Sequence, residues 1–309
     1  MKIAVIGIGG VGGYYGGLLA RKYSASKEHE IVFVARGEHL AAIKKNGLKL
    51  STPGEEFTAV PDVATDNTED LGTFGLVLFC VKSYGLEKAA AQIKKNVGPK
   101  TVIIPLLNGV DIPERIKAIL PGADVLGGLV YIGSSIVGPG HVKQGGGSGQ
   151  LVFGPQDAAK VENYRPVEKL LRDAGIKADL VGDIDLALWT KYIFISSMAG
   201  LTSYFGKTFG EILDSIEGKL FLEGVLKEIE AVARAKKVGF PPDVVRQTMD
   251  KVAAFPHGTK TSLQRDFEKG SQTELEVITG YVLKTGRQLG VPTPLTEKIY
   301  RELSKREAK

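Results

Sequence analysis

Cysteine is nearly absent from this sequence: Cys80 is the only one among 309 residues. A single cysteine excludes an intramolecular disulfide and is typical of proteins from a reducing compartment. Long apolar runs are also missing, because the longest apolar helical stretch, Leu186–Leu201, is interrupted by Lys191, and no charge-free stretch reaches the length of a membrane span. Glycines crowd the N-terminal stretch, which argues against the helical core of a secretory signal. We therefore expect a cytoplasmic protein with no membrane partner.

Histidine is scarce, and its few positions are scattered. None forms a metal-ligand spacing with another histidine or with the cysteine; the four are His29, His39, His141 and His257. The sequence also lacks a Gly-x-Ser-x-Gly nucleophile elbow. The 40 basic and 35 acidic side chains are interspersed, the net charge is +5, and no basic stripe carries interleaved aromatic residues. These absences predict no bound metal and no nucleic-acid partner.

Glycine, by contrast, is abundant at the N-terminal end. The apolar run Ile3–Ile6 predicts a buried parallel strand, and it leads directly into Gly7-x-Gly9-x-x-Gly12 and a helix. This is the dinucleotide-binding fingerprint in its strand–turn–helix context, with glycines for a tight turn, for backbone approach to a pyrophosphate and for close helix packing. Unpaired N–H groups at the helix N-terminus would bind the pyrophosphate. The predicted cofactor-binding residues are Gly7, Ile8, Gly9, Gly10, Val11 and Gly12.

Up to about residue 181 the sequence alternates short β-rich runs with helical patterns. Such alternation predicts a parallel sheet with helices on both faces, so the expected fold class of residues 1–181 is α/β, a Rossmann-like dinucleotide-binding domain. Two segments of short alternating runs, Gly47–Val60 and His141–Phe153, are expected as antiparallel additions at the edge of the sheet. The expected strands are Ile3–Ile6, Ile31–Ala35, Leu76–Val81, Val102–Pro105 and Val125–Val130, with helices such as Gly85–Asn96 and Ile112–Ile119 between them.

Residues 182–309 show only helical patterns and are expected to form an all-α C-terminal domain for substrate binding and catalysis. Helices are expected at about 185–205, 216–237, 241–252, 261–269, 274–290 and 295–306. An α/β nucleotide domain followed by a helical domain implies a ligand cleft between them. The apolar stripes of these helices are compatible with either a domain core or the interface of a homodimer.

In this fold the residue at the end of the second strand indicates whether the cofactor is NAD or NADP. An acidic residue there binds the ribose 2′-hydroxyl of NAD, whereas an arginine accommodates the 2′-phosphate of NADP. Here Ile31–Ala35 is followed by Arg36, and no acid occurs before Glu38. A guanidinium is planar, permanently charged and well suited to phosphate. The predicted cofactor is therefore NADPH; the alternative is that Arg36 is an ordinary surface residue after a strand.

Lys191 is a candidate general acid because it lies within an apolar helical stripe. At three- and four-residue spacing it shares a face with Ile184, Leu188, Ile195, Met198 and Thr202. A buried ammonium needs a partner or a cleft. Reduction of a carbonyl needs such a group, since an ammonium both donates a proton and stabilises the developing alkoxide. The alternative is snorkelling, with an aliphatic stem on the core and a charge in water.

Other polar residues occur where ligands bind in this fold. Asn108 and Lys82 each follow a predicted strand and should lie at the carboxyl edge of the sheet; they could also be a turn residue and a solvated lysine. Ser262 and Glu274 lie in the helical half. Glu274 and Glu276 are two residues apart on a predicted helix, so only one of them can line a given site; either could instead complement a helix dipole.

Taken together, these residues resemble the ketopantoate reductase family (2-dehydropantoate 2-reductase) over essentially the whole chain. The resemblance implies NADPH-dependent reduction of the 2-keto group of ketopantoate to pantoate, in the route to pantothenate and coenzyme A. It implies that Lys191 is the general acid, that Glu274 orients the substrate, and that Ser262 binds the substrate carboxylate. Asn108 would contact cofactor and substrate, and Lys82 would support the site. The motifs that carry the resemblance are Gly7-x-Gly9-Gly10-x-Gly12, Ala35-Arg36-Gly37, Cys80-Val-Lys-Ser83, Leu107-Asn-Gly109, Trp189-Thr-Lys191, Ser262 with Asp266, and Thr273-Glu274.

The sequence departs from the family pattern at two positions. Family members of the best-known type carry asparagines four and eight residues after the catalytic lysine, and here these positions are Ile195 and Ala199. An apolar pocket discriminates weakly against hydroxyl groups, whereas a hydrogen-bonding site discriminates strongly. One alternative is therefore an NADPH-dependent reductase of a different, less hydroxylated 2-keto acid, unless nearby hydroxyls compensate (Ser196, Ser197, Thr202 or Ser203). Another is a non-catalytic NADPH-binding protein.

Overall fold

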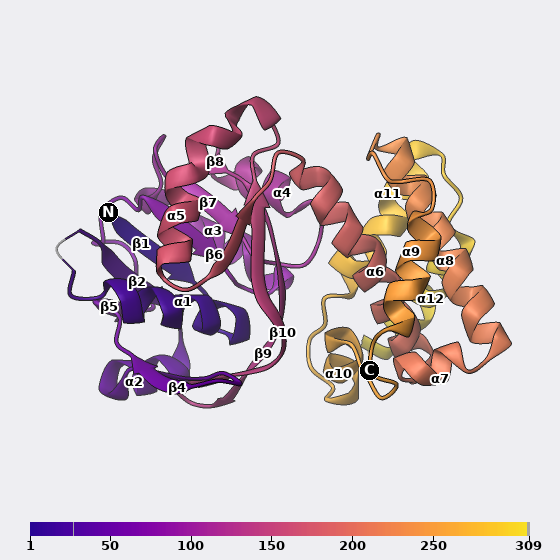
Figure 1. The fold of residues 1–309 in the computed structure, drawn as a ribbon, viewed down its shortest axis with the longest axis horizontal. Coiled ribbons are helices and arrows are strands. Elements are labelled where there is room, and N and C mark those ends of the chain that lie inside the picture. The colour runs from indigo at the N-terminus through magenta and orange to yellow at the C-terminus, as the bar shows by residue number, and fades with distance from the viewer. Residues whose placement is uncertain (27, 308–309) are drawn as a thin grey trace. The chain divides into compact units, whose positions relative to one another are not determined.

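The computed structural model describes residues 1–26 and 28–307. Its contacts divide the chain into two compact units, the first formed by Met1–Leu107 with Asp111–Ile184 and the second by Asn108–Val110 with residues 185 onward (Figure 1). The division after Ile184 falls close to the boundary expected at residue 182. The short segment Asn108–Val110 groups with the helical unit, although it begins three residues after Pro105, the last strand residue before it in the first unit.

The first unit contains a six-stranded, wholly parallel sheet with the strand order β5-β2-β1-β6-β7-β8. Its strands are β1 (Lys2–Ile6), β2 (Glu30–Val34), β5 (Val63–Thr65), β6 (Leu76–Phe79), β7 (Val102–Pro105) and β8 (Asp124–Val125). The apolar runs of β1 and β6 are fully buried, as expected for strands that helices cover on both faces. The helices that alternate with these strands are α1 (Gly10–Tyr23), α2 (Gly37–Asn46), α3 (Leu86–Gln92) and α4 (Ile112–Ile119). The predicted Rossmann-like fold is confirmed.

A second, five-stranded sheet corrects the expectation of antiparallel additions at the sheet edge. It contains β3 (Leu48–Ser51), β4 (Glu56–Ala59), β9 (Gly127–Gly138), β10 (His141–Gly154) and β11 (Lys177–Leu180), the last joined through α5 (Arg165–Asp173). β10 pairs antiparallel with β9 but parallel with β3 and β11. Helix α1 packs against both sheets through glycines, because a Cβ on Gly16 would meet Phe33 of β2 and one on Gly17 would meet Leu50 of β3. The expected strand at 125–130 is split between β8 and β9.

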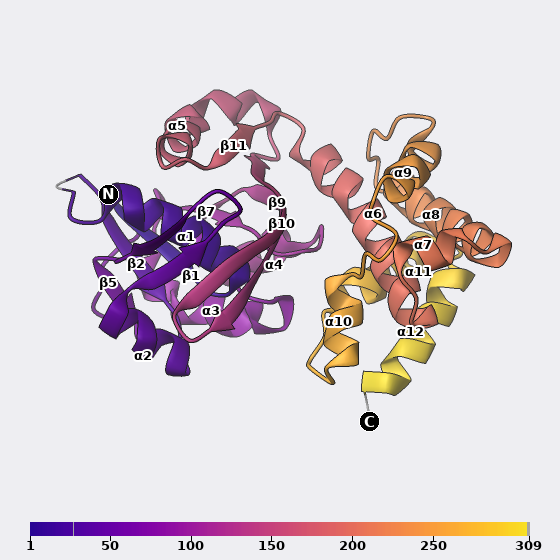
Figure 2. The same ribbon diagram turned by 60° about the horizontal axis from the view of Figure 1, so that its bottom comes forward.

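Among its described residues the second unit contains helices joined by turns and loops, and no strand (Figure 2). Its helices are α6 (Ile184–Phe205), α7 (Phe209–Leu213), α8 (Ile216–Ala235), α9 (Val244–Ala253), α10 (Ser262–Glu268), α11 (Tyr281–Leu289) and α12 (Pro294–Glu307). Side-chain caps explain several starts, including a capping box between Thr208 and Glu211 and the hydroxyl of Thr261 before α10. The helix expected at 274–290 differs from a regular one, because residues Glu276–Gly280 form a π-helical turn.

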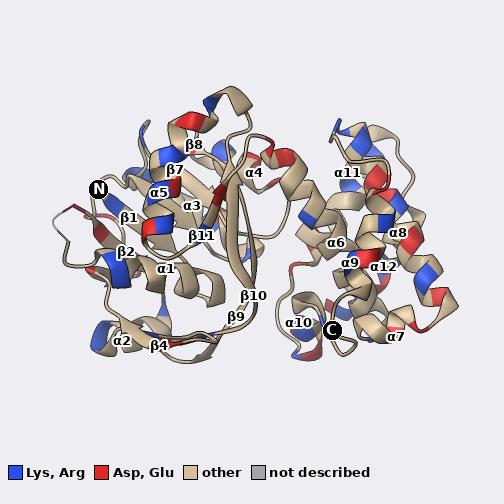
Figure 3. Cartoon of the chain, in the orientation of Figure 1, with Lys and Arg blue, Asp and Glu red and all other residues tan. Residues whose placement is uncertain are grey.

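Acidic and basic residues are mixed along the elements of each unit (Figure 3). This mixture of signs agrees with the interspersed charges of the sequence. None of the described helices has the length and apolar character that crossing a membrane requires. Among the described residues, no cluster of three or more histidine, cysteine or acidic side chains has the arrangement of a metal site.

Candidate active site

The glycine-rich turn joins β1 to α1 under tight steric limits. Gly7 has φ +92°, and its N–H donates to the carbonyl of Val34 at the end of β2, at 2.9 Å. A Cβ at position 12 would lie 2.1 Å from the carbonyl oxygen of Gly7. Gly10 is similarly enclosed, since its Cβ would lie 2.2 Å from the carbonyl oxygen of Ser134. These contacts explain why the turn needs glycine at these positions.

Gly9 differs from its neighbours because nothing lies within 4 Å of the position its Cβ would take. It is the N-cap of α1, and no side chain caps the first turn of that helix. Ile8 is buried, and Val11 packs partly buried on the core. The start of α1 therefore presents backbone N–H groups beside an open position, which fits a dinucleotide pyrophosphate.

Arg36 lies just beyond the end of β2 and is the N-cap residue of α2. Its side chain is exposed, and its guanidinium donates to the amide oxygen of Gln92 at 3.3 Å. The bond from Gly7 to Val34 ties the glycine-rich turn to the end of β2. Arg36 thus follows the strand whose end is tied to the glycine-rich turn, as a group that binds a ribose 2′-phosphate must.

In the helical unit, Lys191 on α6 is partly buried, and its ammonium donates to Oδ1 of Asn108 at 3.1 Å. Burial lowers the pKa of Lys191 to about 8; the carboxylate of Glu274 opposes this shift, and the charge of Lys251 adds to it. The ammonium is therefore bound to an amide and feels the charge of a carboxylate, whereas a snorkelling lysine carries its charge into water.

Glu274 and Glu276 have opposite environments. The side chain of Glu274 is only 5% exposed and acts electrostatically on Lys191, whereas Glu276 is exposed and accepts a hydrogen bond from the hydroxyl of Tyr300 at 2.5 Å. Of the two carboxylates that the sequence left open, Glu274 is thus the one near the ammonium. The structure brings together Lys191, Asn108 and Glu274.

The other two predicted residues, Ser262 and Lys82, are exposed at the starts of helical turns. Ser262 is exposed as the first residue of α10, after the N-cap Thr261. Lys82 is also exposed, shortly after β6, at the start of a 3₁₀ turn over Ser83–Gly85. Because both residues are exposed, the hydroxyl of Ser262 and the ammonium of Lys82 are accessible to a small ligand.

The sequence did not predict the roles of three residues near this cluster, although Ser196 was considered as a compensating hydroxyl. Lys251 on α9 lowers the pKa of Lys191, and its own ammonium lies 4.9 Å from the ring centroid of Phe194. Tyr192 and Ser196, on α6, donate to backbone carbonyls of the π-helical turn that follows Glu274. No sequence signal pairs these positions, because each contact joins residues far apart in the chain.

The hydroxyls next to Ile195 and Ala199 are mostly engaged. Ser196 donates to the carbonyl of Ile278, and Ser197 donates to carbonyls of its own helix. Thr202 hydrogen-bonds Thr261 at 2.8 Å. The buried hydroxyl of Ser203, by contrast, has no hydrogen-bond partner among the described residues. Ile195 is partly buried and Ala199 is buried, so neither position supplies an amide and only Ser203 has a hydroxyl to spare.

Comparison with known proteins identifies the family of this chain. The family described as "Ketopantoate reductase PanE/ApbA" matches residues 3–158, and its C-terminal counterpart, "Ketopantoate reductase PanE/ApbA C terminal", matches residues 183–307. An "Uncharacterized oxidoreductase YkpB" from Bacillus subtilis (strain 168) is 30% identical over 100% of this chain and 99% of its own length.

Solved structures of similar fold cover nearly the whole chain. The 2-dehydropantoate 2-reductase of Porphyromonas gingivalis W83 is 37% identical, with a TM-score of 0.86 over 98% of this chain and 99% of that one. The ternary structure of D-mandelate dehydrogenase with NADH and anilino(oxo)acetate is 23% identical, with a TM-score of 0.88 over 100% and 99%. The latter likeness is one of fold. From the two family matches, which together cover nearly all of the chain, we conclude that this protein is an oxidoreductase of the ketopantoate reductase family.

Proposed function

We propose that the protein reduces a 2-keto acid with NADPH, with ketopantoate as the default substrate and pantoate as its product. The observation that carries the proposal is the Lys191 ammonium, which donates to Asn108 and whose pKa burial lowers to about 8. A general acid works best when its pKa lies near the working pH, because it is then both protonated and ready to release its proton.

The chain's own residues divide the reaction between them. The glycine-rich turn and the start of α1 bind the pyrophosphate, and Arg36 binds the 2′-phosphate. NADPH, when bound, supplies the hydride that reduces the carbonyl carbon. Lys191 gives its proton to the carbonyl oxygen, so that the keto group becomes a hydroxyl and the lysine becomes neutral until it takes a proton from water.

The groups around Lys191 orient its ammonium and favour its protonated form. Asn108 accepts its hydrogen bond and so orients the ammonium. Glu274 favours the protonated form, because a nearby carboxylate raises the pKa of a lysine. Ser262 binds the substrate carboxylate through its exposed hydroxyl, and Lys82 supports the site with a positive charge that suits an anionic substrate. Such an enzyme would serve pantothenate synthesis in the cytoplasm.

One observation favours a second substrate class. Ile195 and Ala199 stand on the face of α6 that carries Lys191, at the positions where the best-known members have asparagines. Without those amides, a hydroxyl on the substrate has fewer hydrogen-bond partners, whereas an apolar substrate side chain gains apolar contact with the site. The second candidate is therefore an NADPH-dependent reductase of a 2-keto acid with an apolar side chain.

The test is the loss of NADPH absorbance with saturating ketopantoate, beside a panel of aliphatic and aromatic 2-keto acids. Efficient turnover of ketopantoate, about 10⁴ M⁻¹s⁻¹ or more, supports the first candidate; preference for an apolar keto acid supports the second. Lys191→Ala should lower turnover by about 10²–10⁴ if the lysine is the general acid. NADPH binding without turnover of any keto acid would refute both and leave a binding protein.

A further inference from the structure

The helix that follows Glu274 is interrupted by an unusual turn. The N–H of Ile278 donates to the carbonyl of Glu274, four residues before it, as in an α-helix. The N–H of Tyr281, by contrast, donates to the carbonyl of Glu276, five residues before it, and Glu276–Gly280 are π-helical. A π-helical turn holds one residue more than an α-helical turn, and such turns occur often at functional sites.

Helix α6 supplies the side chains that hold this turn. The hydroxyl of Tyr192 donates to the carbonyls of Val277 and Ile278, at 2.9 and 2.7 Å. The hydroxyl of Ser196 donates to the same carbonyl of Ile278, at 2.6 Å. Tyr192 and Ser196 are both buried, so these bonds form away from water, where leaving a carbonyl unpaired is unfavourable.

The extra residue sets the rotation of Glu274 about the helix axis relative to α11. In an α-helix each residue advances about 100° around the axis, so removing the π-helical turn would rotate the residues before it by that angle relative to α11. Glu274 is now buried and acts on Lys191, while Glu276 is exposed and bonded to Tyr300. A rotation of that size would turn Glu274 away from the ammonium.

We propose that Ser196 and Tyr192 are positioning residues, which hold the π-helical turn at Glu276–Gly280 and thereby keep Glu274 against Lys191. Both residues lie on α6, the helix that carries Lys191: Tyr192 follows Lys191 by one residue and Ser196 by five. The same helix therefore carries the proton donor and holds in place the carboxylate that favours its protonated form. This inference rests on the proposed function only for the meaning of Lys191 as the proton donor.

Ser197 provides a matched control. It is buried like Ser196, but its hydroxyl donates to the carbonyls of Ile193 and Phe194 in its own helix. Ser197→Ala removes the same atom from the same helix without touching the π-helical turn. Ser196→Ala, Tyr192→Phe and their combination remove one or both donors to the turn. Glu274→Gln shows the full effect of losing the carboxylate.

The experiment measures the pKa of Lys191 without relying on turnover. Competitive acylation across a pH series, followed by peptide mass spectrometry, reports how much of the lysine is neutral at each pH. Two charged groups act on Lys191, namely Glu274 and Lys251. When Glu274 moves away, only the lowering influence of Lys251 and burial remains. A nearby opposite charge shifts a pKa by about one unit or more, so Lys191 should be acylated about five times faster at pH 7.

We expect the double variant to approach Glu274→Gln in this measurement and Ser197→Ala to match the wild type. If the double variant acylates like Ser197→Ala, the positioning role is wrong, even if keto acids are reduced. If the acylation pattern is as expected but no keto acid is reduced, the positioning role stands and the proposed reaction fails. A crystal structure of the double variant, with Glu276–Gly280 either still π-helical or reset to an α-helix, decides the same question independently.

Discussion

Replacing Lys191 by methionine is expected to stabilise the helical unit while it removes turnover. Burial lowers the pKa of this lysine from 10.5 to about 8, so the folded protein binds the proton less tightly than the unfolded chain does. At about 1.4 kcal/mol per pKa unit, the difference is about 3 kcal/mol of stability that the wild type lacks at neutral pH. Methionine has a similar length and no charge, but it cannot donate to Asn108. We therefore expect a net gain of about 1–3 kcal/mol in the free energy of unfolding.

The gain in stability of Lys191→Met should depend on pH, because it comes from the lowered pKa of the lysine. A lysine whose pKa is lowered by folding carries its penalty fully at any pH below the folded value of about 8. The penalty declines as pH rises from there towards the unfolded value of 10.5, above which the amine is neutral in both states. The advantage of Lys191→Met over the wild type should therefore shrink across that window.

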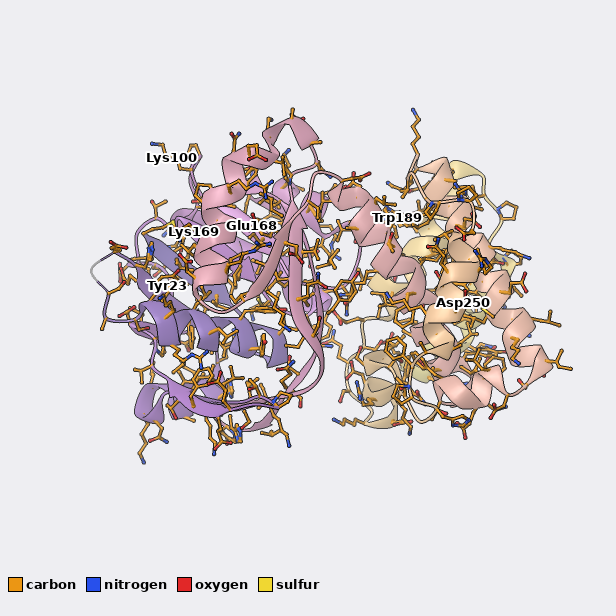
Figure 4. All side chains as sticks on the ribbon, in the orientation of Figure 1. Tyr23, Lys100, Glu168, Lys169, Trp189 and Asp250 are labelled. Carbon is orange, nitrogen blue, oxygen red and sulfur yellow. The ribbon has the colours of Figure 1, made fainter. Side chains whose placement is uncertain are left out.

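The assay can use the protein's only tryptophan, Trp189. It lies on α6, is 4% exposed and contacts the rings of Tyr192 and Tyr281, so its fluorescence reports unfolding of the helical unit (Figure 4). Urea unfolding would be followed at neutral pH and about two units higher, inside the window in which the penalty fades. The control is Lys219→Met, an exposed residue on α8, which should change stability by no more than about 0.5 kcal/mol. A methionine variant less stable than the wild type at neutral pH, or a gain that does not change with pH, would refute the reasoning.

Three further outcomes can be measured on the same protein. The kcat/KM for keto acid reduction should fall about tenfold per pH unit above a pH near the pKa of Lys191, about 8, because only the ammonium can donate; a profile flat through pH 9–10 would contradict this role of Lys191. Arg36→Ala should raise the KM for NADPH by about tenfold or more, the loss of a charged hydrogen bond, and leave that for NADH nearly unchanged; equal losses would show that Arg36 does not bind the 2′-phosphate. Gly9→Ala should fold normally but bind the cofactor weakly, because its Cβ meets no protein atom within 4 Å. Gly12→Ala should instead lower the melting temperature, because its Cβ would lie 2.1 Å from a carbonyl oxygen; thermal unfolding and cofactor titration separate the two.

The sequence was informative wherever a local pattern has one structural outcome. A buried apolar run can form β1, a glycine-rich turn can follow it, and a helix can begin at Gly10, all within a short stretch of chain. The position of Arg36 just after β2 was predictable for the same reason, because it depends only on the strand that precedes it. Helical periodicity likewise predicted α6, α8 and α12. It placed Lys191 on a stripe in which Ile184, Leu188, Met198 and Thr202 are buried and Ile195 is partly buried.

Only the tertiary structure shows which elements cover each helix or strand face and which distant residues contact one another. Periodicity tells which residues of a helix or strand share a face, but it carries no information about the element that covers this face. The second sheet is such a case, because β10 pairs with β3 and β11, both distant in sequence. The turn after Glu274 is another, since it is π-helical and its carbonyls accept bonds from Tyr192 and Ser196 on α6. A lysine in an apolar stripe was visible in the sequence; the amide that orients it and the charges that set its pKa come together only when the chain folds.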